Sequence, residues 1–220
     1  MTPAPNLDVN EALFRAAMHF TAKGDEAAAS PARTGVRIER SGTRGVYIVA
    51  MSRIGAIFLH DPIGSIQEDA TIRMPRAFFD GAKRASIEVG QSAKGARLCV
   101  KHGMASLNPG GDYFQRAEAI EDHAFPDWRE ALPGGASKLF APPVEPESTE
   151  RADTALRILW NAGLCAKVQH FRSDDGAFEI THFGDVGFVL LDAVDTGVSP
   201  LPWRFPLWLS KADQQIEAAS

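Results

Sequence analysis

The sequence predicts an α+β fold in which short strands form antiparallel sheets and helices pack on one face of those sheets. A helix-like stretch followed by three strand-like runs occurs three times. In the three copies the first strand-like runs and their turn lie at residues 36–49, 85–100 and 167–181. Each copy carries a Ser-to-Gly turn after its first run, written SGTRG, SAKG and SDDG. Runs joined by such short turns favour hairpins, whose strands are antiparallel. The repetition indicates a core assembled from copies of one supersecondary unit.

The first helix is predicted over residues 11–23, with a start signal at residues 6–8 and an end at Gly24 and Asp25. Residues 27–34 are small and polar and indicate a loop. The apolar residues that share one side of this helix are Leu13, Ala16, Ala17 and Phe20.

In the strands of the first copy, which continue to residues 56–60, successive side chains are expected to alternate between the two faces of the sheet. We expect Val36, Ile38, Tyr47 and Val49 to face one side of the sheet, with the charged residues of the first strand on the other.

The later helices have clear start signals. Pro75 opens a second helix over residues 76–84, at the first helical position where its missing N–H costs nothing. Ser148 is a good N-cap for a third helix over residues 149–162. An apolar run at residues 204–209 is a final strand candidate.

The composition divides the chain into a larger and a smaller part. Residues 8–133 form a domain of two repeat units, and residues 148–210 form a partial domain of one unit. The stretch GGASKLFAPPVEPE at residues 134–147 combines Gly and Pro with few apolar anchors, as a linker does. Residues 211–220 form a polar tail.

Composition and charge restrict the class of protein. The 220 residues are 45% hydrophobic and 23% charged, as in an ordinary globular protein. The sequence has no bilayer-length apolar run and no secretory signal at its start, so we expect a cytoplasmic protein without membrane contact. Cys99 and Cys165 are then reduced core thiols. The net charge of −5 argues against a simple DNA-coating protein, unless its basic residues gather on one face.

Motifs of common catalytic and cofactor sites, such as GxGxxG, HExxH, CxxC and GxSxG, do not occur in the sequence. His60 with Asp61, and His182 with Asp185, are conceivable base–carboxylate pairs, but they lie at strand ends or turns where a capping histidine is commoner. His170 and His182 supply only half of a zinc site. We expect a protein without catalytic site, metal or cofactor; an enzyme with a pocket assembled by the fold stays an alternative.

Basic residues fall in or beside the three predicted helices. These side chains form either a solvated helix surface or a surface that faces nucleic acid. The candidate DNA-facing residues are Arg15, Lys23, Arg73, Arg76, Lys83, Arg84, Arg151 and Arg157.

Large apolar residues gather outside the predicted strand interiors, for example Phe125, Trp128, Leu132 and Trp203. They either fill a seam between two domains or line an exposed groove that captures a partner peptide, and the two roles are compatible.

Four segments resemble the bacterial sliding clamps, the beta subunits of DNA polymerase III. GVYIVAMSRIGAIFLHDPIG at residues 45–64 resembles a strand–turn–strand stretch of their second domain, and IRMPRAFFDGAKRA at residues 72–85 resembles the strand and helix that follow. AFPDWREALP at residues 124–133 is similar to their inter-domain segment and is the most specific match. RFPLWL at residues 204–209 is similar to their terminal strand.

The resemblance covers residues 8–133 well and residues 149–209 loosely. It implies a DNA-clamp-like fold of repeated units, with helices lining a hole for duplex DNA and sheets outside. It also implies a non-catalytic processivity factor in DNA replication, without cofactors. Because encirclement needs few tight contacts, an acidic outside with basic helices inside suits such a protein.

The resemblance further implies a cleft for a short apolar peptide of a polymerase or another partner. The corresponding residues here are Met51, Arg53, Ile54, Ala56, Pro126, Ala131, Leu132, Phe205, Pro206 and Leu207.

The sequence departs from the family in two ways. The TDGHR turn of the family is replaced by MSRIG at residues 51–55. The chain also corresponds to about one and a half domains instead of three, so a ring requires a homo-oligomer. A clamp-fold interaction module that does not encircle DNA is the alternative.

Overall fold

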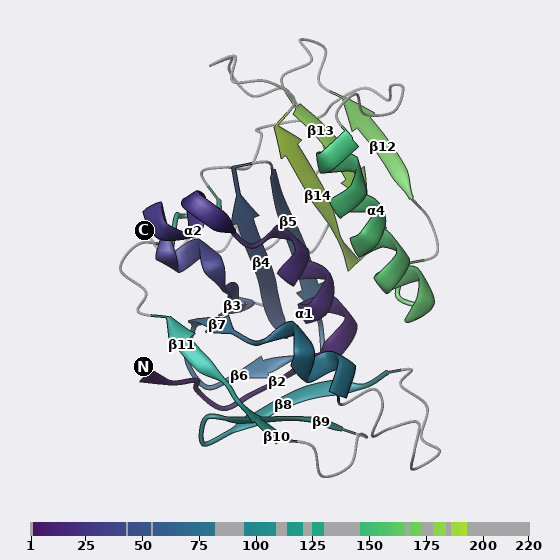
Figure 1. The fold of residues 1–220 in the computed structure, drawn as a ribbon. Coiled ribbons are helices and arrows are strands. Elements are labelled where there is room, and N and C mark those ends of the chain that lie inside the picture. Colours follow the sequence, from purple (N-terminus) through teal and green to yellow (C-terminus); the bar gives the residue numbers. More distant parts are fainter. Residues whose placement is uncertain are drawn as a thin grey trace.

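The computed structural model contains two antiparallel β-sheets with helices packed against them (Figure 1). None of the helices it describes combines the length and apolar character that a bilayer crossing requires. The structure describes residues 2–42, 44–53, 55–81, 95–108, 114–120, 125–129, 146–165, 168–172, 178–183 and 186–192.

The larger sheet has nine strands in the order β1-β11-β7-β3-β4-β5-β14-β13-β12. The predicted hairpins of the first and third copies are both present in it, and they meet where β14 pairs with β5. The third copy therefore continues the sheet of the first. The strands are β1 (Thr2–Pro3), β3 (Val36–Arg40), β4 (Val46–Ser52), β5 (Gly55–Asp61), β7 (Ala70–Arg73), β11 (Glu118–Ile120), β12 (Gln169–Arg172), β13 (Phe178–His182) and β14 (Gly187–Asp192).

The junction between β5 and β14 depends on a glycine. Gly187 has a φ of 149°, and a Cβ atom there would lie 2.0 Å from the carbonyl oxygen of Phe58. Any other residue would push the two strands apart at the start of their pairing.

The smaller sheet has five strands in the order β10-β9-β8-β2-β6. The second copy supplies three neighbouring strands, while β2 comes from the N-terminal segment in which we expected only a helix start. The strands are β2 (Leu7–Asn10), β6 (Ser65–Ile66), β8 (Arg97–Lys101), β9 (Met104–Asn108) and β10 (Phe114–Arg116).

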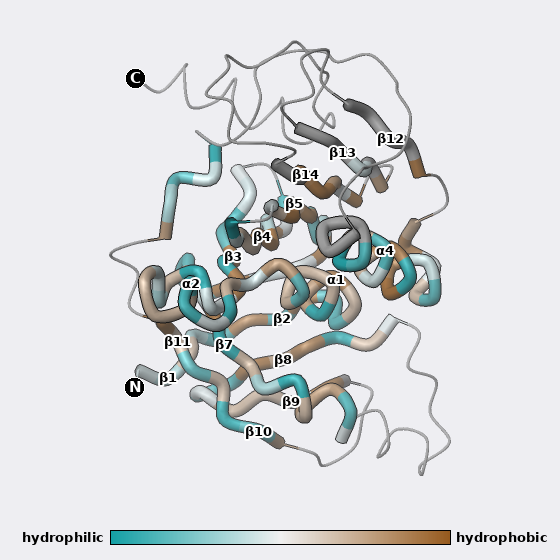
Figure 2. The backbone as a smooth tube through the Cα atoms, turned by 45° about the horizontal axis from the view of Figure 1, so that its top comes forward, coloured by the Kyte–Doolittle hydropathy of each residue, from teal (hydrophilic) through white to brown (hydrophobic). Residues whose placement is uncertain are grey.

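Two longer helices lie on one face of the larger sheet (Figures 1 and 2). Helix α1 (Glu11–Ala17) contacts β4 and β5 of the larger sheet and β2 and β8 of the smaller one, so its buried apolar residues fill the space between the sheets. Helix α4 (Pro146–Asn161) packs beside α1 and buries Ala152, Ala155 and Leu159. A one-turn helix η1 (Met18–Phe20) continues α1, and residues 76–81 form the predicted second helix.

The prediction of a loop over residues 27–34 is wrong. Helix α2 (Gly24–Ala29) and the 3₁₀ turn η2 (Pro31–Thr34) occupy this segment. The segment GDEAAA is short and small, but alanine has the highest helix propensity and acidic residues suit the first turn.

The prediction that Val36, Ile38, Tyr47 and Val49 share one side is also wrong. Ile38 lies opposite Ile48, and Tyr47 lies opposite Glu39. Successive residues point to opposite faces, so Val36, Ile38 and Ile48 face the helices while Tyr47 and Val49 face the outside. The outer face is nevertheless buried, because residues 125–129 cover it.

An arginine connects the two sheets. Arg97 on β8 donates to Asp61 at the end of β5, with 3.0 Å between Nη1 and Oδ2, and its Nε lies 2.6 Å from Oδ1 of Asp8 on β2. The same Asp61 oxygen accepts the backbone N–H of Asn10 at 2.7 Å. Asp61 is 2% exposed, so its charge depends on these partners in place of water.

We expect Arg97→Met to lower the free energy of unfolding by about 3 kcal/mol, because it leaves the buried Asp61 carboxylate without its cation. Urea unfolding followed by circular dichroism measures this change. Adding Asp61→Asn should recover part of the loss. As the matched control, Arg40→Met breaks the exposed pair with Asp69 and should cost at most about 1 kcal/mol. Equal losses in the two single variants would contradict the role of Arg97.

Candidate nucleic-acid interface

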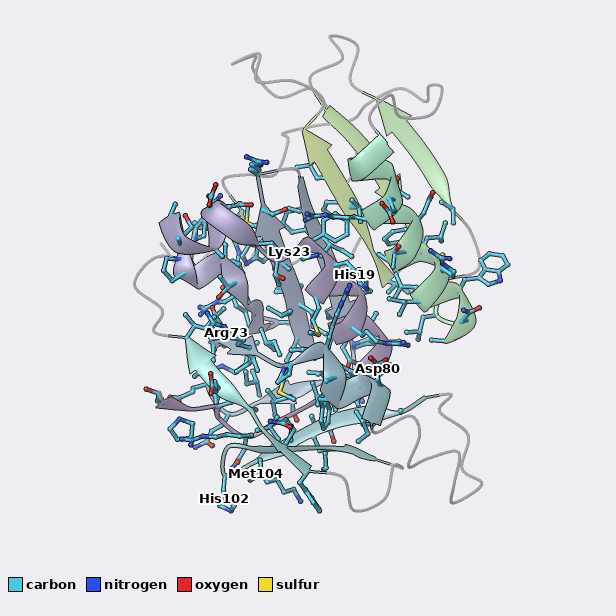
Figure 3. All side chains as sticks on the ribbon, in the orientation of Figure 1. His19, Lys23, Arg73, Asp80, His102 and Met104 are labelled. Atoms are coloured by element: carbon cyan, nitrogen blue, oxygen red, sulfur yellow. The ribbon has the colours of Figure 1, made fainter. Side chains whose placement is uncertain are left out.

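Four of the predicted DNA-facing residues converge on one histidine. Arg15 and His19 are four residues apart, which places them along one side of the helical segment formed by α1 and η1, and Lys23 lies three residues beyond the end of η1. Arg76 of the helix at residues 76–81 and Arg151 of α4 approach His19 from two other elements. Figure 3 shows His19 and Lys23 on the helix side of the larger sheet.

Two arginines contact His19. Nη2 of Arg76 lies 2.7 Å from Nδ1 and 3.1 Å from Nε2 of the His19 ring. Nη1 of Arg151 lies 3.4 Å from the His19 carbonyl oxygen and 3.5 Å from the Ser52 hydroxyl. Arg151 therefore joins α4 to η1 and to the end of β4.

The surrounding charge is reflected in the pKa of His19. Burial lowers this pKa, and the cations Arg76, Lys23, Arg15 and Arg151 lower it further, from 6.5 to about 4. His19 is consequently neutral at pH 7. We define the basic cluster as His19 with these four cations.

One carboxylate moderates the basic cluster. Glu11 lies one turn before Arg15 on α1, with 2.8 Å between Oε1 of Glu11 and Nε of Arg15. Glu11 is buried, whereas Lys23 and Arg76 are exposed and Arg15 and Arg151 are partly exposed. The accessible part of this cluster is therefore positively charged although the chain carries −5 overall.

The other predicted DNA-facing residues are not part of the basic cluster. Arg73 donates to the Thr34 hydroxyl and lies apart from His19 in Figure 3. Arg157 is exposed on α4, 3.4 Å from the Thr154 hydroxyl. Lys83 and Arg84 lie outside the described residues.

A second group of residues covers the outer face of the larger sheet, and we name it the Trp128 cluster. Its centre is Trp128, which is 1% exposed and packs against Tyr47 and Phe58, with ring centroids 5.6 and 5.7 Å away. Phe188 of β14 stacks on Phe58 at 4.9 Å, so the cluster spans the β5–β14 junction. Its remaining members are Val49, Ala56 and Leu190, with Met51 and Phe125 partly buried at its edge.

Glu39 holds the Trp128 cluster to β3. Its Oε2 accepts the indole N–H of Trp128 at 3.0 Å and a guanidinium N–H of Arg129 at 3.0 Å, while Oε1 accepts from Arg37 at 2.9 Å. The guanidinium carbon of Arg129 lies 4.1 Å from the Trp128 ring centroid, a cation–π contact. Burial raises the pKa of Glu39, but the bonds from Arg37 and Trp128 and the charge of Arg129 outweigh it and leave the pKa below 4.5.

The structure describes four of the residues predicted for a peptide cleft. Met51 and Ala56 belong to the Trp128 cluster, and Pro126 lies in the segment that covers it. Arg53 is exposed, and its backbone N–H donates to Glu26 at 2.6 Å. Ile54, Ala131, Leu132, Phe205, Pro206 and Leu207 lie outside the described residues.

Sequence reasoning missed His19 and Glu39. The four-residue spacing of Arg15 and His19 was the available signal for His19, because it predicts that the two residues share one side of a helix. Glu39 had no such signal, because its partners Trp128 and Arg129 lie about 90 residues away in the chain.

His60 and Asp61, considered from the sequence as a base–carboxylate pair, each bond to other groups of the fold. Nε2 of His60 lies 2.9 Å from the carbonyl oxygen of Arg44, and Asp61 is occupied by Asn10 and Arg97. Burial lowers the pKa of His60. Within the described residues, no three His, Cys, Asp or Glu side chains gather closely enough to hold a metal ion.

Comparison with known proteins identifies the fold. The crystal structure of the beta subunit of DNA polymerase III from Thermotoga maritima superposes with a TM-score of 0.53 over 93% of this chain and 67% of that one, at 10% identity. The chain has a clamp-like fold. No protein-family model and no curated protein matches its sequence. The α+β class with antiparallel sheets is confirmed; the domain limits and the equivalence of the repeat units stay predictions.

We expect Glu39→Gln to destabilise the protein by about 2 kcal/mol near neutral pH, because charged hydrogen bonds are lost. The folded-state pKa of Glu39 lies below 4.5. Its contribution is therefore complete above pH 4.5 and is lost as the pH falls through the folded-state value. Urea unfolding at a series of pH values should show the two proteins converging in acid. The exposed Glu68→Gln is the matched control, and a pH-independent difference for Glu39→Gln would contradict this account.

Proposed function

We propose that this chain is a clamp-like accessory protein without a catalytic site of its own, which contacts duplex DNA through its helix side. The observation that carries the proposal is the basic cluster. Helix α1, the segment after η1, the helix at residues 76–81 and α4 bring Arg15, Lys23, Arg76 and Arg151 around His19 on one side of a clamp-like fold. The structurally similar protein is a DNA polymerase III subunit, which supports a role beside a polymerase.

The electrostatics suit sliding better than tight binding. A local positive field steers a polyanion toward one side of a molecule even when the net charge is negative. Contacts of arginine and lysine with phosphates fix the position of a duplex without reading its sequence. We therefore expect non-specific binding that weakens steeply with salt.

The Trp128 cluster supports a second part of the proposal, a site for an apolar peptide of a polymerase or another partner. Met51 and Phe125 are partly exposed at the edge of this cluster, while Trp128 fills its centre. The rigid aromatic centre would support a peptide at that edge without rearranging. Arg53, Ile54, Ala131, Leu132, Phe205, Pro206 and Leu207 remain proposed members of this site.

The alternative function is a clamp-fold interaction module that binds a protein partner and does not contact DNA. The pairing of Glu11 with Arg15 favours this alternative, because it neutralises one of the cations that would face DNA. Measurements of DNA binding and of the oligomeric state distinguish the two functions.

We expect Arg76→Gln with Arg151→Gln to weaken binding to a labelled duplex of arbitrary sequence and to make it less sensitive to salt. Each phosphate contact that is lost should reduce the slope of log K against log salt by about 0.9. Fluorescence anisotropy over a range of salt concentrations measures both quantities.

The matched control for this experiment is Arg40→Gln with Arg116→Gln, which removes the same charge from β3 and β10 and should leave the slope unchanged. If both double variants weaken binding equally, net charge and not the basic cluster is responsible. If the unmodified protein does not bind a duplex at low salt, the DNA-contacting function is wrong and the interaction module is favoured.

We also expect the protein to assemble into a homo-oligomer, because this chain aligns with 67% of one chain of the matched subunit and a ring needs further domains. Light scattering at about 1 μM and about 100 μM measures the mass. A constant multiple of the 23.8 kDa chain mass is the expected result. A monomer at both concentrations would contradict a closed ring and favour the interaction module.

A further inference from the structure

Strand β10 lies at the edge of the smaller sheet, and the outer side of its backbone faces no other described strand. The N–H of Ala117 donates to the carbonyl oxygen of Gly103 at 2.8 Å, on the side of β9. Backbone groups of successive strand residues point alternately to the two sides. Gln115 therefore also faces β9, whereas Phe114 and Arg116 face outward. These two residues present their N–H and carbonyl groups to a further strand.

The side chains along this edge share one face of the smaller sheet. Met104 of β9 lies opposite Arg116 of β10 and opposite Lys101 of β8, so these three residues form a row across the strands. Phe114 is two residues from Arg116 and points to the same face. The neighbouring Ala105 points the other way, into the apolar core. We define the β10 edge site as Phe114, Arg116, Met104 and Lys101.

The β10 edge site is accessible, and it carries positive charge. Phe114 is 56% exposed and Met104 is 44% exposed. Arg116 and Lys101 are exposed too, and neither forms an ion pair with a carboxylate of the described residues. Adjacent exposed apolar side chains beside an open strand edge are typical of a surface that binds another chain.

The chemistry of the site favours a peptide with a carboxylate. An acidic side chain opposite Arg116 would form a cross-strand ion pair, and an apolar side chain opposite Phe114 would cover its ring. Asp8, on the same face of β2, already pairs with Arg97 at 2.6 Å and does not compete. A nucleic-acid strand could meet the cations, but it has no backbone amides to pair with β10.

The edge strands of a second copy do not supply this carboxylate. The strands at the edges of the two sheets are β1, β12, β6 and β10. Their residues include no aspartate or glutamate, and β10 and β12 each contain an arginine instead. Pairing with either of these would add a cation to a site that already has two. The charges therefore favour a different protein as the partner.

We propose that the β10 edge site binds an extended acidic segment of another protein, which joins the smaller sheet as an antiparallel strand. The segment places a carboxylate opposite Arg116 and, two residues later, an apolar side chain opposite Phe114. Its pattern is therefore acidic residue, any residue, apolar residue. Met104 lies apart from His19 and Lys23 in Figure 3, and this inference does not depend on the proposed contact with DNA.

The test follows the backbone amides of the full chain by NMR while a peptide is added. The probe is a threonine-rich peptide with Glu-Thr-Phe at its centre, because threonine favours extended backbone. The amide signals of Phe114 and Arg116 should shift and exchange more slowly with solvent. The amide of Gln115 should change less, because it already faces β9. The same peptide with Lys in place of Glu should bind about fivefold more weakly.

Charge reversal supplies the matched variants. Arg116→Glu should reverse the preference, so that the Lys peptide binds more tightly than the Glu peptide. Arg44→Glu, on the exposed segment between β3 and β4, makes the same change of charge elsewhere and should keep the original preference. Should Arg116→Glu fail to fold, the preference of the unmodified protein for the Glu peptide decides.

Several results would overturn the inference. These are no shift at about 1 mM peptide, equal affinity for the two peptides, and shifts that spare Phe114 and Arg116. If oligothymidine shifts these two amides and the Glu peptide does not, the site binds single strands. If these amides exchange slowly in the protein alone, where light scattering shows an oligomer, a second copy occupies the edge.

Discussion

The contact between Arg97 and Asp61 determines how the two sheets are placed. Helix α1 fills the space between them with apolar side chains, and apolar packing by itself is tolerant of small sliding movements. The guanidinium of Arg97 removes that freedom, because it must reach Asp61 across the sheets and Asp8 within its own sheet. Asn10 adds a backbone bond to Asp61 and also caps α1 by accepting from Ala12. The start of α1, and hence the position of Arg15 and His19, is thus fixed to the same carboxylate.

The larger sheet has two buried faces with different chemistry. On the helix side an apolar layer supports the basic cluster, which gathers charge from α1, the segment after η1, the helix at residues 76–81 and α4. On the outer side the Trp128 cluster is closed by one carboxylate, Glu39, that satisfies three donors. On the outer face Glu39 and Asp127 oppose Arg37 and Arg129, two charges of each sign, whereas the basic cluster has four cations and one neighbouring carboxylate, Glu11. This asymmetry is the physical basis for the proposal that the helices contact nucleic acid.

Local sequence patterns predicted three helices and the hairpin of β4 and β5, but they did not predict which face of the sheet each side chain occupies. Helices were predicted at residues 11–23, 76–84 and 149–162, and the structure has helices at residues 11–17, 76–81 and 146–161, so α4 starts before the predicted N-cap Ser148. The hairpin of β4 and β5 was also predicted from its turn, whereas α2 and β2 were not. The prediction of the face on which Tyr47 lies was wrong, because a strand buried on both sides has no polar side that would indicate its orientation. The group around His19 joins residues 57 and 132 positions away from it, and sequence spacing carries no information about such contacts. The four cations are all among the predicted DNA-facing residues, because each lies in or beside a helical segment; their contact with DNA stays a prediction.

The pairing of β14 with β5 has a consequence for how the chain is made. During synthesis β3, β4 and β5 emerge early, whereas the strand that covers the open edge of β5 comes more than half of the 220-residue chain later. Until then the nascent sheet presents a long apolar strand with unpaired backbone groups, which is the kind of edge that pairs with other chains. Closure of this edge is a contact of high sequence separation, and such contacts form slowly. Translation speed and chaperone supply should therefore affect how much of this protein reaches the folded state.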